Sequence, residues 1–191
     1  AAARRDPAAA LAPDDDARHL LDRLRFLARV MPELGLPSVE ALLDDAVAAL
    51  CDGRRSFAEL RRADLGGALR GRLSHAQRQA LEREAPPRLT LPSGRSVPIA
   101  YGAEKPPAAA ARIQEVFGLG ATPRLGGGRV PLVLELLAPN QRPVQITDDL
   151  ASFWKSAYFE VRKDLRTRYP KHAWPEDPLT APPQAKGRPR R

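Results

Sequence analysis

The chain has 191 residues, which is enough for one ordinary domain or two small ones with a core that needs no disulfide or metal. Hydrophobic residues make up 43% and charged residues 28%, which excludes wholesale disorder and a fibrous design. The net charge is +8, and residues 150–191 hold 10 basic and 4 acidic side chains, so a polyanionic partner such as RNA, DNA or an anionic surface is favoured.

Cysteine content and hydropathy indicate which metal sites and which cellular compartment to expect. Cys51 is the only cysteine, so no intramolecular disulfide can form, and no Cys/His cluster has the spacing of a zinc site. No run of about 18 apolar residues exists for a membrane span, and the N-terminus lacks the pattern of a signal peptide. We therefore expect a cytoplasmic location, no membrane contact and no bound metal. The chain starts without methionine, which indicates a piece of a longer protein.

The first half is predicted to be a helical subdomain over residues 14–85, preceded by a flexible tail at 1–13 that is rich in Ala and Pro. Apolar residues recur at the helical period in four segments, three of which open on a good N-cap or an acidic first turn. These predicted helices cover residues 14–30, 38–51, 56–65 and 74–84. Gly66-Gly67 is expected to weaken or break the third one.

From residue 86 the pattern becomes mixed, which predicts a second domain over 86–178 followed by a basic, disordered tail at 179–191. The expected elements are a hairpin at 88–101, a helix at 108–117 ended by Gly118, strands at 130–137 and 143–147, and a long helix from Asp148 to about Arg168 capped by Thr147. Because helices and strands mix without a regular strand–helix alternation, the fold class is predicted to be α+β, with a helical half, β-hairpins and a long C-terminal amphipathic helix.

A nucleotide-hydrolysing site is not indicated by the sequence. A phosphate-binding loop needs Gly-x-x-x-x-Gly-Lys-Ser/Thr, whereas the nearest segment, Gly66 to Leu73, has Arg72 in place of Lys and Leu73 where the Mg²⁺ ligand belongs. The three histidines lie far apart and lack the spacing of a zinc pair, and no serine elbow is present. An independent enzyme is therefore the least favoured interpretation, and no catalytic residue is assigned.

The segment 148–168 carries the most specific signal for binding. Its apolar face is expected to be core and comprises Leu150, Phe153, Trp154, Ala157, Tyr158, Val161 and Leu165. The other face collects Lys155, Arg162, Lys163 and Arg166 around Phe159. Single-stranded nucleic acid uses such a surface, with phosphates on the cations and a base on the ring. The alternative is an ordinary solvated face with Phe159 packed under another segment.

The next segment, residues 168–178, contains three Xaa-Pro pairs that hold the chain extended. Its aromatic side chains, Tyr169 and Trp174, are expected to anchor it across the domain surface rather than to contact a ligand. Its cations Arg168 and Lys171 complete the candidate nucleic-acid-binding set.

Several segments also resemble one protein family. They are Gly128–Pro139, Arg142–Thr147, Asp149–Trp154 and Arg168–Pro178, and with further matches upstream they extend over about residues 15–178. Together they resemble the C-terminal domain of bacterial HrpB-type DEAH-box ATP-dependent helicases.

The resemblance implies a parent protein whose two RecA-like motor domains bind ATP, Mg²⁺ and RNA. No catalytic residue of that family has a position in this chain, so no cofactor is expected here. The chain is then a non-catalytic accessory region with the motor domains and RNA as its partners. The alternative function is a protein-docking module that makes no nucleic-acid contact.

Overall fold

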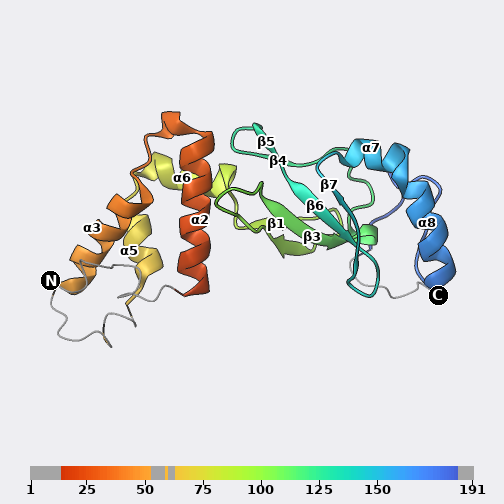
Figure 1. Cartoon of the computed structure of the whole chain (residues 1–191), viewed down its shortest axis with the longest axis horizontal. Coiled ribbons are helices and arrows are strands. Elements are labelled where there is room, and N and C mark those ends of the chain that lie inside the picture. The colour runs from red at the N-terminus through yellow and green to blue at the C-terminus, as the bar shows by residue number, and fades with distance from the viewer. Residues whose placement is uncertain (1–13, 53–58, 60–62, 185–191) are drawn as a thin grey trace. The chain divides into compact units, whose positions relative to one another are not determined.

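A computed structural model describes residues 14–52, 59 and 63–184 and divides the chain into two compact units (Figure 1). The helical unit comprises the chain up to Pro87 together with Tyr101–Glu104. The mixed unit comprises Arg88–Ala100 and the chain from Lys105 onward. The combination of helices with mixed sheets confirms the predicted α+β class. Among the residues that the structure describes, no helix combines the length and the hydrophobicity of a membrane span.

Short capped helices build the described part of the helical unit. They are α2 Asp15–Val30, the 3-10 turn η2 Pro32–Leu34, α3 Val39–Cys51, α5 Leu65–Gly71 and α6 His75–Glu84. Each α-helix starts after a side chain that accepts a hydrogen bond from a first-turn amide, namely Asp14, Ser38, Asp64 and Ser74. The helices predicted at 14–30, 38–51 and 74–84 are therefore confirmed.

The core of the helical unit is aliphatic and includes one buried cation. α2 packs against α3, α5 and α6 and buries Leu20, Leu24 and Leu27. Arg23 of α2 is only 2% exposed, and its Nε donates to the Ala85 carbonyl at 2.6 Å while its Nη2 lies 2.9 Å from Glu82 Oε1. Because a buried guanidinium is costly unless it is paired, these bonds hold α2 and the end of α6 together.

Gly66-Gly67 lies inside helix α5 and not at the end of the helix predicted at 56–65, because Ala63 and Asp64 are not helical. α5 starts at Leu65 and includes both glycines, because the Asp64 carboxylate caps it by accepting the N–H of Gly67 at 2.7 Å. A Cβ on Gly67 would collide with this carboxylate, so glycine permits the cap instead of ending the helix. Most of the helix predicted at 56–65, including its start at Ser56, lies outside the described residues.

The described part of the mixed unit contains one three-stranded sheet and two small antiparallel pairs. Its strands are β1 Arg88–Thr90, β2 Ser96–Pro98, β3 Ala108–Arg112, β4 Arg124–Leu125, β5 Val130–Pro131, β6 Val133–Leu137 and β7 Pro143–Thr147. β1 pairs with β2 and β4 with β5, while the larger sheet has the order β3-β6-β7. β3 is parallel to β6, and β7 is antiparallel to β6. The predicted hairpin and the strand at 143–147 are confirmed, whereas the run 130–137 is divided at Leu132 into β5 and β6.

The helix predicted at 108–117 is wrong. Ala108–Arg112 is strand β3, and it is followed by the 3-10 turn η3 at Ile113–Glu115. Alanine favours helix in isolation, but here Ala109 and Ala111 alternate into the core, at 3% and 1% exposure. Pairing with β6 satisfies the backbone of this segment, so a partner distant in sequence outweighs the local preference.

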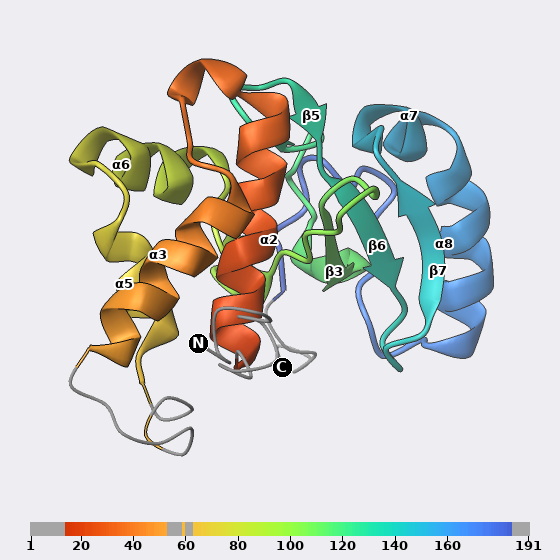
Figure 2. The same ribbon diagram turned by 60° about the vertical axis from the view of Figure 1, so that its left-hand side comes forward.

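The long helix predicted from Asp148 to Arg168 is two helices, α7 Leu150–Lys155 and α8 Ala157–Arg168. Ser156 separates them with φ −129° and ψ −82°, and the change of direction is visible in Figure 2. The Ser156 hydroxyl donates to the carbonyl of Ser152 at 2.7 Å, a contact that bends helices. Asp149, rather than the predicted Thr147, is the N-cap of α7.

Four aromatic side chains form an aromatic cluster within the mixed unit. They are Phe117, Phe153, Trp154 and Tyr158, each at most 3% exposed. The ring centroid of Trp154 lies 4.9 Å from that of Phe153 and 5.2 Å from that of Tyr158. Its indole Nε1 donates to the Leu119 carbonyl at 2.8 Å. The aromatic members of the predicted apolar face are therefore core, as expected.

We expect Trp154→Ala to lower the free energy of unfolding by about 3–5 kcal/mol, because it removes a large ring from this cluster. Lys155 is exposed, so Lys155→Ala should change stability by less than about 0.5 kcal/mol. Urea melts of the two variants and the parent chain measure both values. Equal and small effects would show that the two faces have been assigned wrongly.

Candidate nucleic-acid interface

The exposed side of α8 presents an aromatic ring beside two cations. Phe159 is 48% exposed, and Lys163 and Arg166 are exposed about one and two turns further along the helix. The side chains of Lys163 and Arg166 form no hydrogen bond or ion pair with any residue that the structure describes. We call these three residues the α8 stripe. Glu160 and Asp164 are also exposed on α8, so the helix as a whole carries charges of both signs.

Arg162, predicted to belong to the same basic face, has a structural role. Its side chain is 18% exposed, its Nε donates to the Trp174 carbonyl at 2.9 Å, and its Nη2 lies 3.4 Å from Glu176 Oε1. The guanidinium is therefore engaged within the fold. Replacing it would disturb the chain that it holds as well as any ligand contact.

The remaining predicted cations lie in separate places. Lys155 is exposed at the end of α7, and the bend at Ser156 removes it from the helix that carries the α8 stripe. Arg168 is exposed as the last residue of α8, and Lys171 is exposed in the turn that follows it. The structure thus brings Phe159, Lys163 and Arg166 together on one helix, but it does not extend a single basic face over all seven candidates.

The segment Tyr169–Pro178, which we call the strap, is not extended throughout as predicted, because it turns at 170–172, where the His172 N–H donates to the Tyr169 carbonyl at 3.1 Å. Of its two aromatic residues, Trp174 anchors it, as predicted, whereas Tyr169 is half-buried. Trp174 is 7% exposed, and its Nε1 donates to the Tyr169 carbonyl at 2.8 Å. The hydroxyl of Tyr158 donates to the Pro175 carbonyl at 2.8 Å. Burial raises the pKa of Tyr158 to about 12, so this hydroxyl keeps its proton and its hydrogen bond at neutral pH.

A pocket of about 370 Å³ opens between α7, α8 and the end of the strap. We call it the α7–α8 pocket; it is lined by Gly120, Ala151, Trp154, Lys155, Phe159, Glu176, Asp177, Pro178 and Leu179. Apolar atoms predominate, because Phe159 and Leu179 are 48% and 47% exposed. Two of the three most exposed large hydrophobic side chains of the described chain thus meet in one place, which makes this pocket a candidate binding surface.

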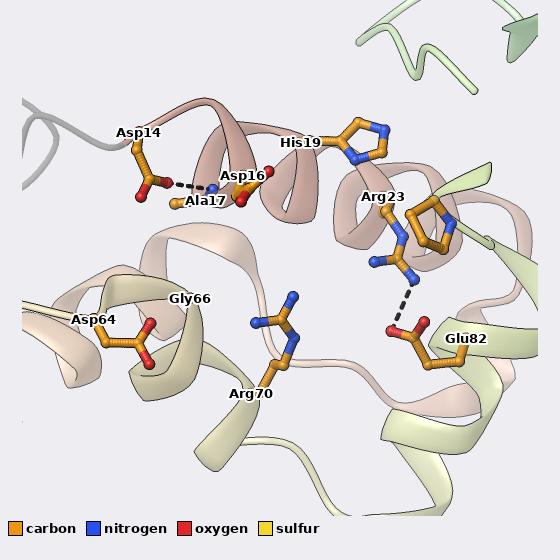
Figure 3. A pocket seen from close by; sticks show the side chains of 10 residues that line it. Asp14, Asp16, Ala17, His19, Arg23, Asp64, Gly66, Arg70 and Glu82 are labelled. Carbon is orange, nitrogen blue, oxygen red and sulfur yellow. Dashed lines mark hydrogen bonds and ion pairs between the residues drawn. The ribbon is translucent and has the colours of Figure 1, made fainter. Parts of the chain in front are cut away.

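A second pocket of about 340 Å³ lies within the helical unit (Figure 3). Figure 3 shows Arg70 pointing into it, with the Arg23–Glu82 ion pair at one side. Four carboxylates also line it, which disfavours a phosphate there. No three His, Cys, Asp or Glu side chains of the described chain are arranged to hold a metal ion. This pocket is therefore the weaker candidate for a nucleic-acid or metal site.

Comparison with known proteins decides the family. The model of the ATP-dependent helicase C-terminal family, HrpB_C, matches residues 47–178, which is more than half of the chain. The chain belongs to this family. The match includes α7, α8 and the strap, and it confirms the resemblance found in the sequence.

The chain is similar to a part of E. coli HrpB, both in sequence and in solved structure. It is 44% identical over 173 residues to the ATP-dependent RNA helicase HrpB of Escherichia coli (strain K12), an alignment covering 88% of this chain and 21% of that protein. A crystal structure of the E. coli DExH-box NTPase HrpB has a TM-score of 0.85 and 42% identity, covering 91% of this chain and 22% of that one. For a crystal structure of the E. coli DEAH/RHA helicase HrpB the TM-score is 0.75 and the identity 41%, over 90% and 22%. The chain thus spans about a fifth of the length of its HrpB relatives.

The glycine-containing segment of this HrpB family member does not fit a nucleotide phosphate. Most of the segment Gly66 to Leu73 is helix α5, and the N–H of Gly67 is bonded to the Asp64 carboxylate. A phosphate-binding loop needs such amides to point at the ligand. The geometry therefore gives no reason to assign ATP or Mg²⁺ to these residues.

The mixed unit contains a buried ion-pair network that was not predicted from the sequence. Glu115 is fully buried, and its carboxylate accepts from Arg95 Nη1 at 3.0 Å, from Arg112 Nη2 at 2.8 Å and from the Arg112 N–H at 3.1 Å. Burial raises the pKa of the Glu115 carboxyl, but the hydrogen bonds from Arg112 and Arg95 outweigh burial, so its pKa is lowered. The only signal in the sequence is the i,i+3 spacing of the opposite charges Arg112 and Glu115.

We expect Glu115→Ala to lower the free energy of unfolding by about 3–5 kcal/mol at neutral pH, since it leaves Arg112 without its buried partner. The pKa of Glu115 is lower in the folded than in the unfolded state, so its stabilisation is present above about pH 4.3 and is lost as pH falls through the folded pKa. Denaturant melts across this range should show parent and variant converging in acid.

Glu160→Ala, which removes an exposed carboxylate, serves as the control and should leave stability nearly unchanged. A stability difference between Glu115→Ala and the parent that stays constant with pH would contradict a charged Glu115 in the folded state.

Proposed function

We propose that this chain is a non-catalytic accessory region at the C-terminal end of a longer ATP-dependent helicase. The family description and the one-fifth coverage of the HrpB relatives support this. The parent's motor domains are then its natural partners, and ATP and Mg²⁺ act in those domains, not in this chain.

We further propose that the region contacts single-stranded RNA through the α8 stripe. The observation that carries this proposal is the exposure of Phe159 beside Lys163 and Arg166, two cations with no partner among the described residues. Ordinary core packing does not require an exposed ring in that position, whereas stacking of a base beside phosphate contacts does. The relative's name, ATP-dependent RNA helicase, makes RNA the first nucleic acid to test.

The second candidate function is protein docking without nucleic-acid contact. It is favoured by the engagement of Arg162 with the strap and by the exposed carboxylates of Glu160 and Asp164, which dilute the positive charge of α8. The two functions differ in salt dependence, because phosphate contacts release counterions and lose affinity as salt rises.

Reversing both stripe cations, Lys163→Glu and Arg166→Glu, should weaken binding of single-stranded RNA roughly tenfold or more, because attraction at two phosphates becomes repulsion. The slope of log affinity against log salt should become shallower by about 1.4. Fluorescence anisotropy of a labelled oligomer over a salt series measures both quantities. Arg162 is left intact because it holds the strap.

Two matched controls separate the stripe from general charge. Arg142→Glu with Lys105→Glu makes the same change in net charge at exposed cations outside α8 and outside both pockets, and should have a smaller effect. Truncation after Gln184 removes Lys186, Arg188, Arg190 and Arg191. If binding survives reversal of the stripe but disappears on truncation, the terminal cations carry it, and docking becomes the better account of α8.

A further inference from the structure

The α7–α8 pocket is lined by large apolar side chains that the fold leaves exposed to solvent. Phe159 projects from α8 and Leu179 follows the strap, and each is nearly half exposed. Leu179 is held in place because its own N–H donates to Asp177 Oδ1 at 2.9 Å. Trp154 also lines the pocket and is fixed by its hydrogen bond to Leu119. The Trp154 ring and the backbone at Leu179 are therefore fixed by bonds within the fold.

The charges around the pocket differ on its two sides. The carboxylates of Glu176 and Asp177 line it by the strap, and Lys155 lines it from α7. Both carboxylates have partners within the fold, because Glu176 lies by Arg162 and Asp177 accepts from Leu179 and Thr180. Lys163 and Arg166, the cations of the stripe, lie further along α8, about one and two turns beyond Phe159.

This arrangement suits a nucleotide with its base inside the pocket and its phosphate outside. Carboxylates beside the strap repel a phosphate within the pocket, whereas a neutral base pays no such penalty. A planar base can lie against the Phe159 ring and the Leu179 side chain, since every base has a face that stacks on aromatic groups. The neighbouring phosphates then reach Lys163 and Arg166.

We propose that the α7–α8 pocket receives one unpaired base of single-stranded RNA, with Phe159 and Leu179 as its contacts. This inference rests on the proposed RNA contact of the α8 stripe. It adds that a base of the bound RNA enters the pocket. The competing occupant is an apolar side chain of a partner protein. The rim carries charges of both signs, so it offers a partner protein no pattern of complementary ion pairs.

The test uses the whole chain and two probes, a single-stranded RNA of about 12 nucleotides and an oligomer of the same length whose riboses carry no bases. Phe159→Ala should weaken binding of the natural RNA by about 5- to 150-fold, the range that stacking of one base on an aromatic ring supports. Leu179→Ala should weaken it by a smaller factor, because leucine adds apolar contact without stacking. Binding of the oligomer without bases should not change. Ile146→Ala is the matched control, because Ile146 is the third exposed large hydrophobic residue, at 60%, and lies on β7 outside the pocket.

A second measurement does not depend on the variants. Trp154 lines the pocket, so natural RNA should change the tryptophan emission of the parent chain, and the oligomer without bases should not. If Phe159→Ala and Leu179→Ala bind natural RNA as tightly as the parent while reversal of Lys163 and Arg166 still weakens binding, the base pocket is wrong and the RNA contact stands. If the parent chain binds neither oligomer, both proposals are wrong.

Discussion

Tyr158 is the side chain on which the candidate interface depends. It is fully buried in the aromatic cluster, and its ring centroid lies 5.2 Å from that of Trp154 and 6.5 Å from that of Phe117. Its hydroxyl also holds the strap through the Pro175 carbonyl. Because successive residues of a helix are rotated by about 100°, fixing Tyr158 in the core directs Phe159 to the surface. One buried residue therefore sets both the orientation of α8 and one side of the α7–α8 pocket.

Arginine in this chain serves the fold as much as it serves the surface. Arg23 crosses to α6, Arg112 surrounds the buried Glu115 together with Arg95, and Arg162 holds the strap. Their planar guanidinium groups satisfy several acceptors at once, which suits them to buried or half-buried positions. The cations left for a ligand are fewer than the net charge suggests. Composition alone could not separate the two groups, and for this reason the predicted basic face was broader than the observed α8 stripe.

Much of the fold could be predicted because helix starts and apolar faces depend on residues close together in the sequence. The caps at Ser38 and Ser74 and the aromatic members of the apolar face of 148–168 were evident from spacing. The errors lie where a distant partner decides: β3 is a strand because β6 pairs with it, and Arg162 is structural because the Trp174 carbonyl lies beside it. The bend at Ser156 depends on a bond to its own helix that competes with helical continuation. At the site, the ring and its cations were identified, but the pocket was not, because Leu179 comes from a segment predicted to be a tail.

The central claim is that the aromatic cluster and the strap hold α8 so that its outer stripe meets single-stranded RNA. The most direct measurement is an NMR titration of the isotopically labelled chain with an unlabelled single-stranded RNA of about 12 nucleotides. The account predicts that the largest shift changes occur at Phe159, Lys163, Arg166 and Leu179, with the helical unit almost unaffected. Changes confined to residues 185–191 or to the helical unit, with none on α8, would contradict it.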